Sequence, residues 1–185
     1  MSVLKEKRQE TPFTVRINAL DMRQKITEYS FRRFGKKPRT MPKQPSNWEK
    51  WSDKSREDWT RKEEEKLANA EKFDDWFITN ERTIIDRMLR RILFDIDKAN
   101  IMRPVTVAEC DKQRELMDDA IGTCSNLIHE LQYIAETIPS NKNFVIKTVE
   151  LIEKEIRLLR GWRKSTNANR EKVMGGAKEI EKGSL

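Results

Sequence analysis

The chain has 185 residues, of which 36% are hydrophobic and 37% charged, and its formal net charge is +7 at pH 7. This length suits one domain with appendages rather than two independent domains, and the low hydrophobic fraction predicts that part of the sequence lies outside any packed core. The positive charge attracts polyanions such as nucleic acid, anionic lipid or an acidic partner, and charge alone does not choose among them.

Membrane insertion and secretion are not expected. No apolar run approaches the roughly 20 residues that span a bilayer, and the N-terminal stretch "MSVLKEKRQE" lacks the apolar segment of a secretion signal. Cys110 and Cys124 lie about 21 Å apart along one predicted helix, too far to form a disulfide bond with each other. We therefore expect a reduced, cytoplasmic setting and no membrane partner.

Residues 18–34 are predicted to form the first helix, after an N-terminal arm at residues 1–17. Asn18 begins the helix, because its side chain is of the type that accepts a hydrogen bond from the free N–H groups of a first turn. The apolar residues that then repeat at helical spacing are Met22, Ile26 and Tyr29. Gly35 is a natural stop, since glycine readily adopts the left-handed conformation that commonly ends a helix.

Residues 35–72 are predicted to form a basic, exposed linker that contains prolines and tryptophans. Its first part, "GKKPRTMPKQP", disfavours helix because each proline restricts the residue before it. Ser55 can open a separate helix further on, but the apolar residues that follow are too sparse for a deep packed face. We expect this helix to be peripheral.

Residues 73–165 are predicted to form the core of the fold. The helix that starts at Phe73 has a wide apolar stripe, made by Trp76, Phe77, Ile84, Ile85, Met88, Leu89, Ile92, Leu93 and Ile96. The next helix begins at Thr106, which forms a capping box with Glu109, and it closes at Pro139.

The last core helix is capped by Ser140, and its inward stripe runs as far as Trp162. After Ser165 the periodicity fades, so residues 166–185 are predicted to be a flexible tail. Short connections in the second half of the chain favour antiparallel neighbours. The sequence therefore predicts an all-α fold, an up-and-down four-helix bundle with an extended, basic N-terminal region and a flexible C-terminal tail.

Nothing in the sequence indicates an enzyme. His129 is the only histidine, and no cysteine stands at ligand spacing from it, so a metal site has little support. No Gly-rich phosphate loop is present, and no carboxylate pair accompanies a nucleophile. Cys124 lies on a buried stripe, where burial raises the thiol pKa and lowers its reactivity. We expect no catalytic residue, no metal and no cofactor.

Basic clusters are the stronger feature. Cations gather at the end of the first helix and in the linker, and three tryptophans follow them. Lys and Arg neutralise phosphates, while aromatic rings stack on unpaired bases. The alternative is a solvated linker whose tryptophans dock on the bundle, and the sequence leaves both open. The candidate nucleic-acid-binding residues here are Arg32, Arg33, Lys36, Lys37, Arg39 and Lys43, with Trp48, Trp51 and Trp59 as stacking candidates.

Two further basic rows lie on predicted core helices. They are Arg157, Arg160, Arg163 and Lys164 on the last helix, and Arg87, Arg90 and Arg91 on the helix from Phe73. Arginine can grip phosphate by two hydrogen bonds at once, and a helix holds the spacing fixed. Gly161 and Trp162 are predicted to anchor the end of the last helix. Arg163 and Lys164 would there either complement the helix dipole or face phosphate.

Two segments together resemble a known family. They are "RILFDIDKANIMRP" and "AIGTCSNLIHELQYIAETIPSNKNFVIKTVELIEKEIRLLRGWRKSTN", the second of which closes on Gly161-Trp162-Arg163-Lys164-Ser165. They are similar to the four-helix-bundle accessory variability determinants of diversity-generating retroelements, and to small proteins of tailed phages and gut bacteria. The resemblance covers roughly residues 73–169. In that family the bundle forms a ring, thought to have five subunits, whose basic surface binds a reverse transcriptase and its template RNA.

The resemblance implies a non-enzymatic protein that scaffolds a reverse transcriptase and its structured template RNA for mutagenic cDNA synthesis. It implies a homo-oligomer in the cytoplasm of a bacterial host, encoded by the host or by a phage. Exposed apolar residues such as Phe144 and Leu158 also suggest burial between copies. The resemblance implies that Arg157, Arg160, Arg163 and Lys164 face the nucleic acid or the polymerase, with Trp162 as a structural anchor. The long region before Phe73 departs from the compact members of the family.

Two other classes of protein stay open. One is a phage or plasmid DNA-binding protein, for example a mobilisation or packaging accessory that assembles around duplex DNA. The other is a structural phage component that binds no nucleic acid strongly. Binding to folded RNA and to duplex DNA of equal length, compared at matched salt, distinguishes these classes.

Overall fold

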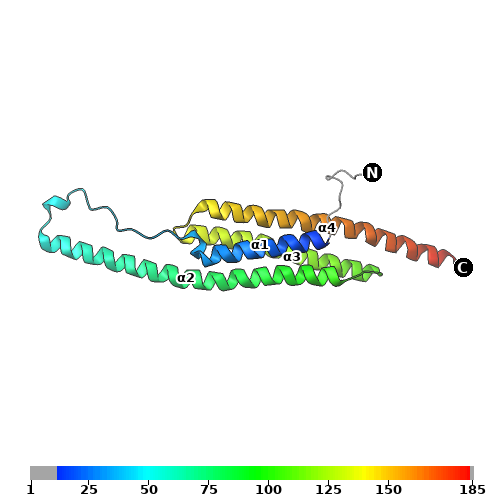
Figure 1. Cartoon of the computed structure of the whole chain (residues 1–185). Helices are drawn as coiled ribbons and strands as arrows, with labels where there is room; N and C mark the ends of the chain where they lie inside the picture. The colour runs from blue at the N-terminus through cyan, green and yellow to red at the C-terminus, as the bar shows by residue number, and fades with distance from the viewer. Residues whose placement is uncertain (1–11, 184–185) are drawn as a thin grey trace.

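The computed structural model describes residues 12–183, with side chains described as far as residue 175. Within that range the chain forms four α-helices and no β-strand, which confirms the predicted all-α bundle (Figure 1). The helices are α1 (Pro12–Phe31), α2 (Asp53–Ile101), α3 (Val107–Thr137) and α4 (Lys142–Gly183). Short 3-10 turns at Arg33–Gly35 and Trp48–Lys50 interrupt the segment between α1 and α2.

The four helices pack in chain order around one core. α1 contacts α2 and α4, and α3 contacts the same two helices. Each helix is antiparallel to the helices that it contacts. In α2, for example, Phe77 precedes Arg91, whereas in α3 the partner of Phe77, Tyr133, follows the partner of Arg91, Asp119. The bundle is therefore up-and-down, with α1 and α3 on one diagonal and α2 and α4 on the other.

The core is formed by an apolar stripe from every helix. Ile26, Leu89, Leu127 and Ile152 come from α1, α2, α3 and α4 in turn, and each is at most 1% exposed. Removing such a side chain from water stabilises the fold by about 2 kcal/mol. The predicted stripe of α2 is buried at Phe77, Ile85, Leu89, Ile92, Leu93 and Ile96. The prediction was wrong for Trp76, which is 62% exposed.

α1 begins at Pro12, not at Asn18. Proline suits a first helical position because its missing N–H would be unpaired there anyway. Residues 12–17 therefore belong to the helix, and the predicted arm is limited to residues 1–11, which lie outside the described part of the chain. Asn18 is no cap, because it is buried inside the helix and its side chain bonds across the bundle.

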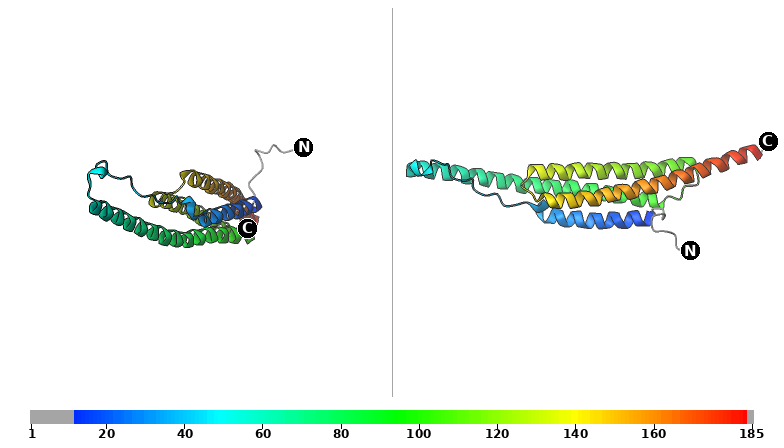
Figure 2. Two further views of the ribbon diagram at one scale, coloured as in Figure 1. Left: turned by 60° about the vertical axis from the view of Figure 1, so that its left-hand side comes forward. Right: turned by 90° about the horizontal axis from the view of Figure 1, so that it is seen from above.

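α2 is one continuous helix, where the sequence predicted a linker to residue 72 and new helix starts at Ser55 and Phe73. Ser52 caps it, since its Oγ accepts a hydrogen bond from the Ser55 N–H at 3.3 Å. No proline or glycine follows to break the helix. Its N-terminal part projects beyond the other three helices. Residues 36–52 lie beside this part and lead from the end of the bundle out to the start of α2 (Figures 1 and 2).

The linker is held against α2 by ion pairs. Asp74 is fully buried and accepts two hydrogen bonds from the Arg39 guanidinium, at 2.7 and 2.8 Å. Lys36 Nζ lies 3.2 Å from the same carboxylate and also bonds to Glu71. These bonds lower the pKa of Asp74, the hydrogen bond from Arg39 having the largest effect. Residues 36–39 are thus a fixed strap, which the sequence did not predict.

The ends of α3 and the start of α4 follow local signals. Thr106 and Glu109 form the predicted capping box, and α3 gives way at Ile138 to the turn with Pro139. The side chain that accepts from the first free N–H groups of α4 belongs to Asn141, whose Oδ1 accepts from the Asn143 N–H at 3.1 Å. Ser140, the predicted cap, instead pairs with Lys36 in an isolated backbone bridge.

α4 continues to Gly183, far beyond the predicted end at Ser165. Thr166 is 2% exposed and donates to Gln113 of α3 at 3.4 Å. One turn further on, the Arg170 guanidinium makes two bonds to Asp111, at 2.7 and 3.2 Å. Polar contacts with α3 therefore keep this segment helical where apolar periodicity is lost. Residues 184 and 185 of the predicted tail lie outside the described part of the chain.

Candidate nucleic-acid interface

The exposed side of α4 carries a row of cations. Lys154, Arg157, Arg160 and Lys164 follow one another at steps of three or four residues and are all exposed. Arg157 lies 4.0 Å from Glu153 and is 67% exposed, while no carboxylate within residues 12–175 pairs with Arg160 or Lys164. An unbroken helix fixes the spacing of these groups. We call these four residues the α4 row. Lys154 was missed from sequence, although it lies three residues before Arg157 and so continues the same spacing toward the start of the helix.

Arg163 does not belong to this row. Its Nε lies 3.1 Å from Asp118 of α3, and the side chain is 38% exposed. Trp162 beside it is 3% exposed and belongs to the core. Gly161 and Trp162 lie well inside α4 and do not anchor its end as predicted, so a C-terminal dipole effect on Arg163 does not apply. Arg163 ties α4 to α3.

Three of the six cations predicted at the end of the first helix and in the linker form ion pairs with carboxylates of the described chain, and three do not. Those nearest the bundle pair with carboxylates of α2: Arg33 bonds to Asp75, while Lys36 and Arg39 share Asp74. The free ones are Arg32, Lys37 and Lys43, which are exposed and form no ion pair with any residue that the structure describes. The predicted continuous basic patch is thus neutralised at three of its six positions.

The positive charges of the predicted arginine row on α2 are also largely neutralised by carboxylates of the same chain. Arg90 pairs with Asp86 at 2.7 Å, and Arg91 pairs with the buried Asp95 at 2.8 Å. Arg87 is exposed and pairs with no described carboxylate. These residues lie on the helix diagonally opposite α4. The structure therefore does not bring the two predicted basic rows together on one face.

The three linker tryptophans pack on one another at the far end of α2. The Trp48 ring lies 5.7 Å from Trp51 and 5.2 Å from Trp59, between ring centroids. The Arg56 guanidinium lies 6.0 Å above the Trp48 ring and donates to the carbonyls of Trp48 and Glu49. All three rings are partly buried by this packing. They form a compact tip rather than three separate stacking platforms.

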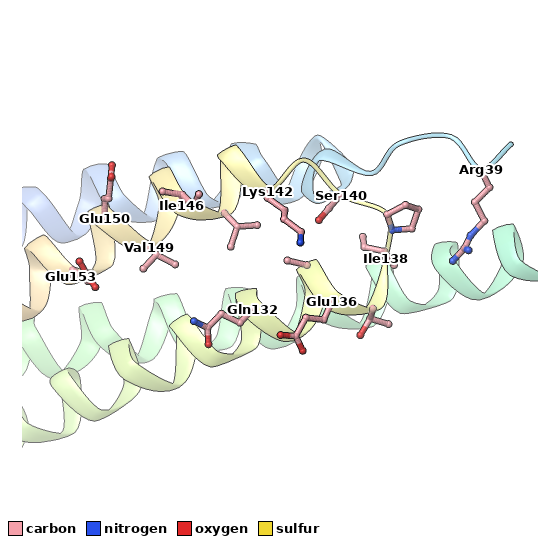
Figure 3. A pocket seen from close by; sticks show the side chains of 14 residues that line it. Arg39, Gln132, Glu136, Ile138, Ser140, Lys142, Ile146, Val149, Glu150 and Glu153 are labelled. Atoms are coloured by element: carbon pink, nitrogen blue, oxygen red, sulfur yellow. The ribbon is translucent and has the colours of Figure 1, made fainter.

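A groove of about 1040 Å³ lies between the end of α3 and the start of α4 (Figure 3). Its floor is apolar and includes Ile138, Val145 and Val149. Its rim carries the carboxylates of Glu136, Glu150 and Glu153, and Lys142 and Arg39 lie toward the turn between α3 and α4. Carboxylates at the rim repel phosphate, so this groove does not suit nucleic acid.

Burial raises the pKa values of three carboxyl groups, those of Glu81, Asp95 and Glu155. Burial raises the pKa of Glu155 to about 7, against the lowering effect of a hydrogen bond from Asn18. Burial and the neighbouring Glu130 carboxyl together raise the pKa of Glu81 to about 7, burial having the larger effect. Glu81 and Glu155 were missed from sequence, although a signal was present: Glu81 lies four residues from both Phe77 and Ile85, and Glu155 lies between Ile152 and Leu159 at helical spacing, so each is in phase with a buried stripe.

The residues considered for catalysis have ordinary structural positions. His129 is exposed on α3, and Cys110 and Cys124 are buried and unpaired. Burial raises the pKa of the Cys124 thiol, and the nearby Glu155 adds to this effect. Among the described residues, no group of three or more His, Cys, Asp or Glu side chains is placed to hold a metal ion.

None of the helices in the described range offers an apolar stretch long enough to cross a bilayer. The fold defines the protein as a four-helix bundle with a projecting second helix. No family model, curated protein or solved structure matches the chain.

Proposed function

We propose that the protein is a non-enzymatic accessory protein that binds structured RNA along the α4 row. The observation that carries this proposal is the pair Arg160 and Lys164, two exposed cations on a rigid helix with no described carboxylate partner. Lysine and arginine at fixed spacing neutralise successive phosphates and release their counterions. The charge distribution supports the same face, because basic residues outnumber acidic ones in α4 while the reverse holds in α3.

The family resemblance sets the biological role within this proposal. An accessory protein of a diversity-generating retroelement would hold a reverse transcriptase and its template RNA together for mutagenic cDNA synthesis, in the cytoplasm of a bacterial host. Assembly into a ring would repeat the α4 row around an axis. Of the two apolar residues expected between copies, Phe144 is 39% exposed, whereas Leu158 is only 9% exposed and already packs in the core.

The test is binding of a fluorescently labelled, folded RNA to the full chain, followed by anisotropy at 50 to 200 mM salt. We expect R160E/K164E to weaken binding at least tenfold, and to reduce the slope of log affinity against log salt by about 2. R87E is the control for a single charge reversal, because Arg87 is also exposed and lies on the diagonally opposite helix. Equal losses in the two variants, or no RNA binding, would refute the α4 row as the interface.

A duplex DNA of equal length distinguishes the main alternative. Tighter binding to duplex DNA than to folded RNA at matched salt would favour a DNA-mobilisation or packaging role. The retroelement role is tested by co-purification from cells that express the chain with a retroelement reverse transcriptase and its template RNA. Recovery of the polymerase only when the chain is present supports scaffolding, and recovery of neither partner excludes it.

A further inference from the structure

An exposed cluster of aromatic rings covers part of the α2–α3 surface. Phe73 and Trp76 of α2 are 45% and 62% exposed, and Tyr133 of α3 is 53% exposed. The nearly buried Phe77 links them, with its centroid 5.8 Å from Phe73 and 5.5 Å from Tyr133. Phe73 in turn lies 6.0 Å from Trp76. We call these four residues the aromatic patch. Exposed rings gathered in this way are unusual on a surface that contacts only water.

Two carboxyl groups lie one helical turn from the patch. Glu81 follows Phe77 on the same face of α2, and Glu130 precedes Tyr133 on α3. Because the two helices are antiparallel, the carboxyl groups face each other on the rung next to the Phe77–Tyr133 ring contact, and they interact directly. Glu81 is 5% exposed, and its Oε2 has no hydrogen-bond partner.

No cation of the described chain neutralises this pair. Neither Glu81 nor Glu130 forms an ion pair within residues 12–175. Arg82, the next residue along α2, is turned toward α1, where it donates to the backbone carbonyls of Ser30 and Phe31. Two facing carboxyl groups without a counter-charge are electrostatically unfavourable. The surface therefore lacks a positive group at this position.

We propose that the aromatic patch and the Glu81–Glu130 pair dock an arginine or lysine side chain of a partner protein. A cation placed over Trp76 or Tyr133 gains cation–π attraction, and its N–H groups can bond to the Glu130 carboxylate. The surrounding rings bury apolar residues that flank the cation, so the fitting partner is a basic segment with apolar neighbours. Phosphate is excluded by the carboxyl groups. This surface is distinct from the α4 row, and its occupancy does not depend on RNA binding.

The facing carboxyl groups make docking pH-dependent. Burial, and then the neighbouring Glu130 carboxyl, raise the pKa of Glu81 to about 7. Below that pH the pair holds a proton and offers less negative charge, and above it both carboxyl groups ionise. The charged group that acts on Glu81 from α3 is Glu130, while Arg82 on α2 is engaged with α1. A docked cation favours the ionised pair, so binding strengthens from pH 6 to pH 8 and releases protons.

The experiment titrates the full chain with Nα-acetyl-arginine amide, and with Nα-acetyl-citrulline amide as an uncharged isostere, without nucleic acid present. The readout is the indole N–H resonance of Trp76 and the ring resonances of Tyr133. We expect saturable shifts with the arginine amide, binding at least about tenfold weaker with the citrulline amide, and stronger arginine binding at pH 8 than at pH 6.

E130Q is the decisive variant, and E136Q is its control on an exposed position of the same helix. Neutralising Glu130 removes a repulsion, so E130Q is expected to fold, which circular dichroism verifies. We expect E130Q to weaken arginine binding about tenfold and E136Q to leave it unchanged. Equal responses to both amides, no response, or undiminished binding by E130Q would overturn the proposal. None of these outcomes bears on RNA binding by the α4 row.

Discussion

Asn18 of α1 donates a hydrogen bond of 2.6 Å to the buried carboxyl group of Glu155 of α4. The two residues are 7% and 0% exposed and lie at the contact between helices that are remote in sequence. Only one oxygen of Glu155 is satisfied in this way, since Oε1 has no hydrogen-bond partner. The bond therefore holds α1 against α4, but it also leaves a carboxyl group buried between them. Because the protonation of that group depends on pH, the stability of the bundle depends on pH as well.

The first prediction concerns that pH dependence. The pKa of Glu155 is raised to about 7 in the fold, above its ordinary value of 4.5. Between these pH values the unfolded chain loses the proton while the folded chain keeps it. The stability that Glu155 contributes is therefore fully present below about pH 4.5 and is lost as pH rises to 7. We expect E155Q to reduce this fall by about 2 kcal/mol, measured by urea unfolding at pH 5 and pH 8.

E150Q is the control for this effect, because Glu150 lies on the exposed side of the same helix. Its unfolding free energy should follow that of the unmodified protein at both pH values. An unchanged pH dependence in E155Q would mean that Glu155 is not the group that titrates.

The second prediction concerns the strap. D74A leaves Lys36 and Arg39 without their shared carboxylate, and removing one partner of a buried ion pair costs about 3 to 5 kcal/mol. D75A removes an exposed carboxylate at the next position, for which we expect a loss of no more than about 1 kcal/mol. Thermal or urea unfolding of the two variants measures the difference, and equal losses would show that the strap contributes little.

The third prediction separates the tip from the bundle. R56A removes the side chain that bonds to the carbonyls of Trp48 and Glu49. Hydrogen exchange should accelerate in residues 45–52 without change in the core of the bundle, because the tip has no contact with that core. R61A is the control, since Arg61 pairs only with Asp58 on the same helix. Acceleration throughout the bundle in R56A would contradict a local role.

The fourth prediction concerns the length of α4. A chain ending after Ser165 loses the contacts of Thr166 and Arg170 with α3, and we expect it to be less stable by about 1 to 3 kcal/mol. A chain ending after Gly175 keeps those contacts, and Gly175 has no atom of another segment within 4 Å of its Cβ position. Its melting temperature should match that of the full chain. Equal stability of the two truncated chains would show that the packed part of α4 ends near Ser165.

The predictions from sequence succeeded where the signal was local. The Thr106–Glu109 capping box was found because both partners lie within one turn. The core residues were largely found because apolar spacing identifies the inward face of a helix. The continuity of α2 was missed because its projecting part has few apolar residues. Its contacts are with segments that precede it: Arg56 bonds to the carbonyls of Trp48 and Glu49, and Glu71 accepts from the Arg39 N–H of the strap. Likewise, polar contacts from Gln113 and Asp111 extend α4 without leaving an apolar pattern.

The same distinction applies to the candidate interface. Exposure of Arg157, Arg160 and Lys164 follows from their phase on the helix, which sequence provides. The pairing of Arg163 with Asp118 depends on which helix packs beside α4 and in what register, so no local pattern predicts it. The proposed role itself stays a prediction, which the RNA-binding experiment tests.

The projecting part of α2 sets a length scale for the whole protein. From Asp53 to Lys72 an α-helix rises about 30 Å, so the tip stands that far from the end of the bundle. The protein thus holds the tip and the bundle at a fixed separation. A ligand at the tryptophan tip and a ligand on α4 would therefore be kept at a constant distance from each other. Inserting or deleting whole turns in the projecting part of α2 would change that distance and leave both surfaces intact.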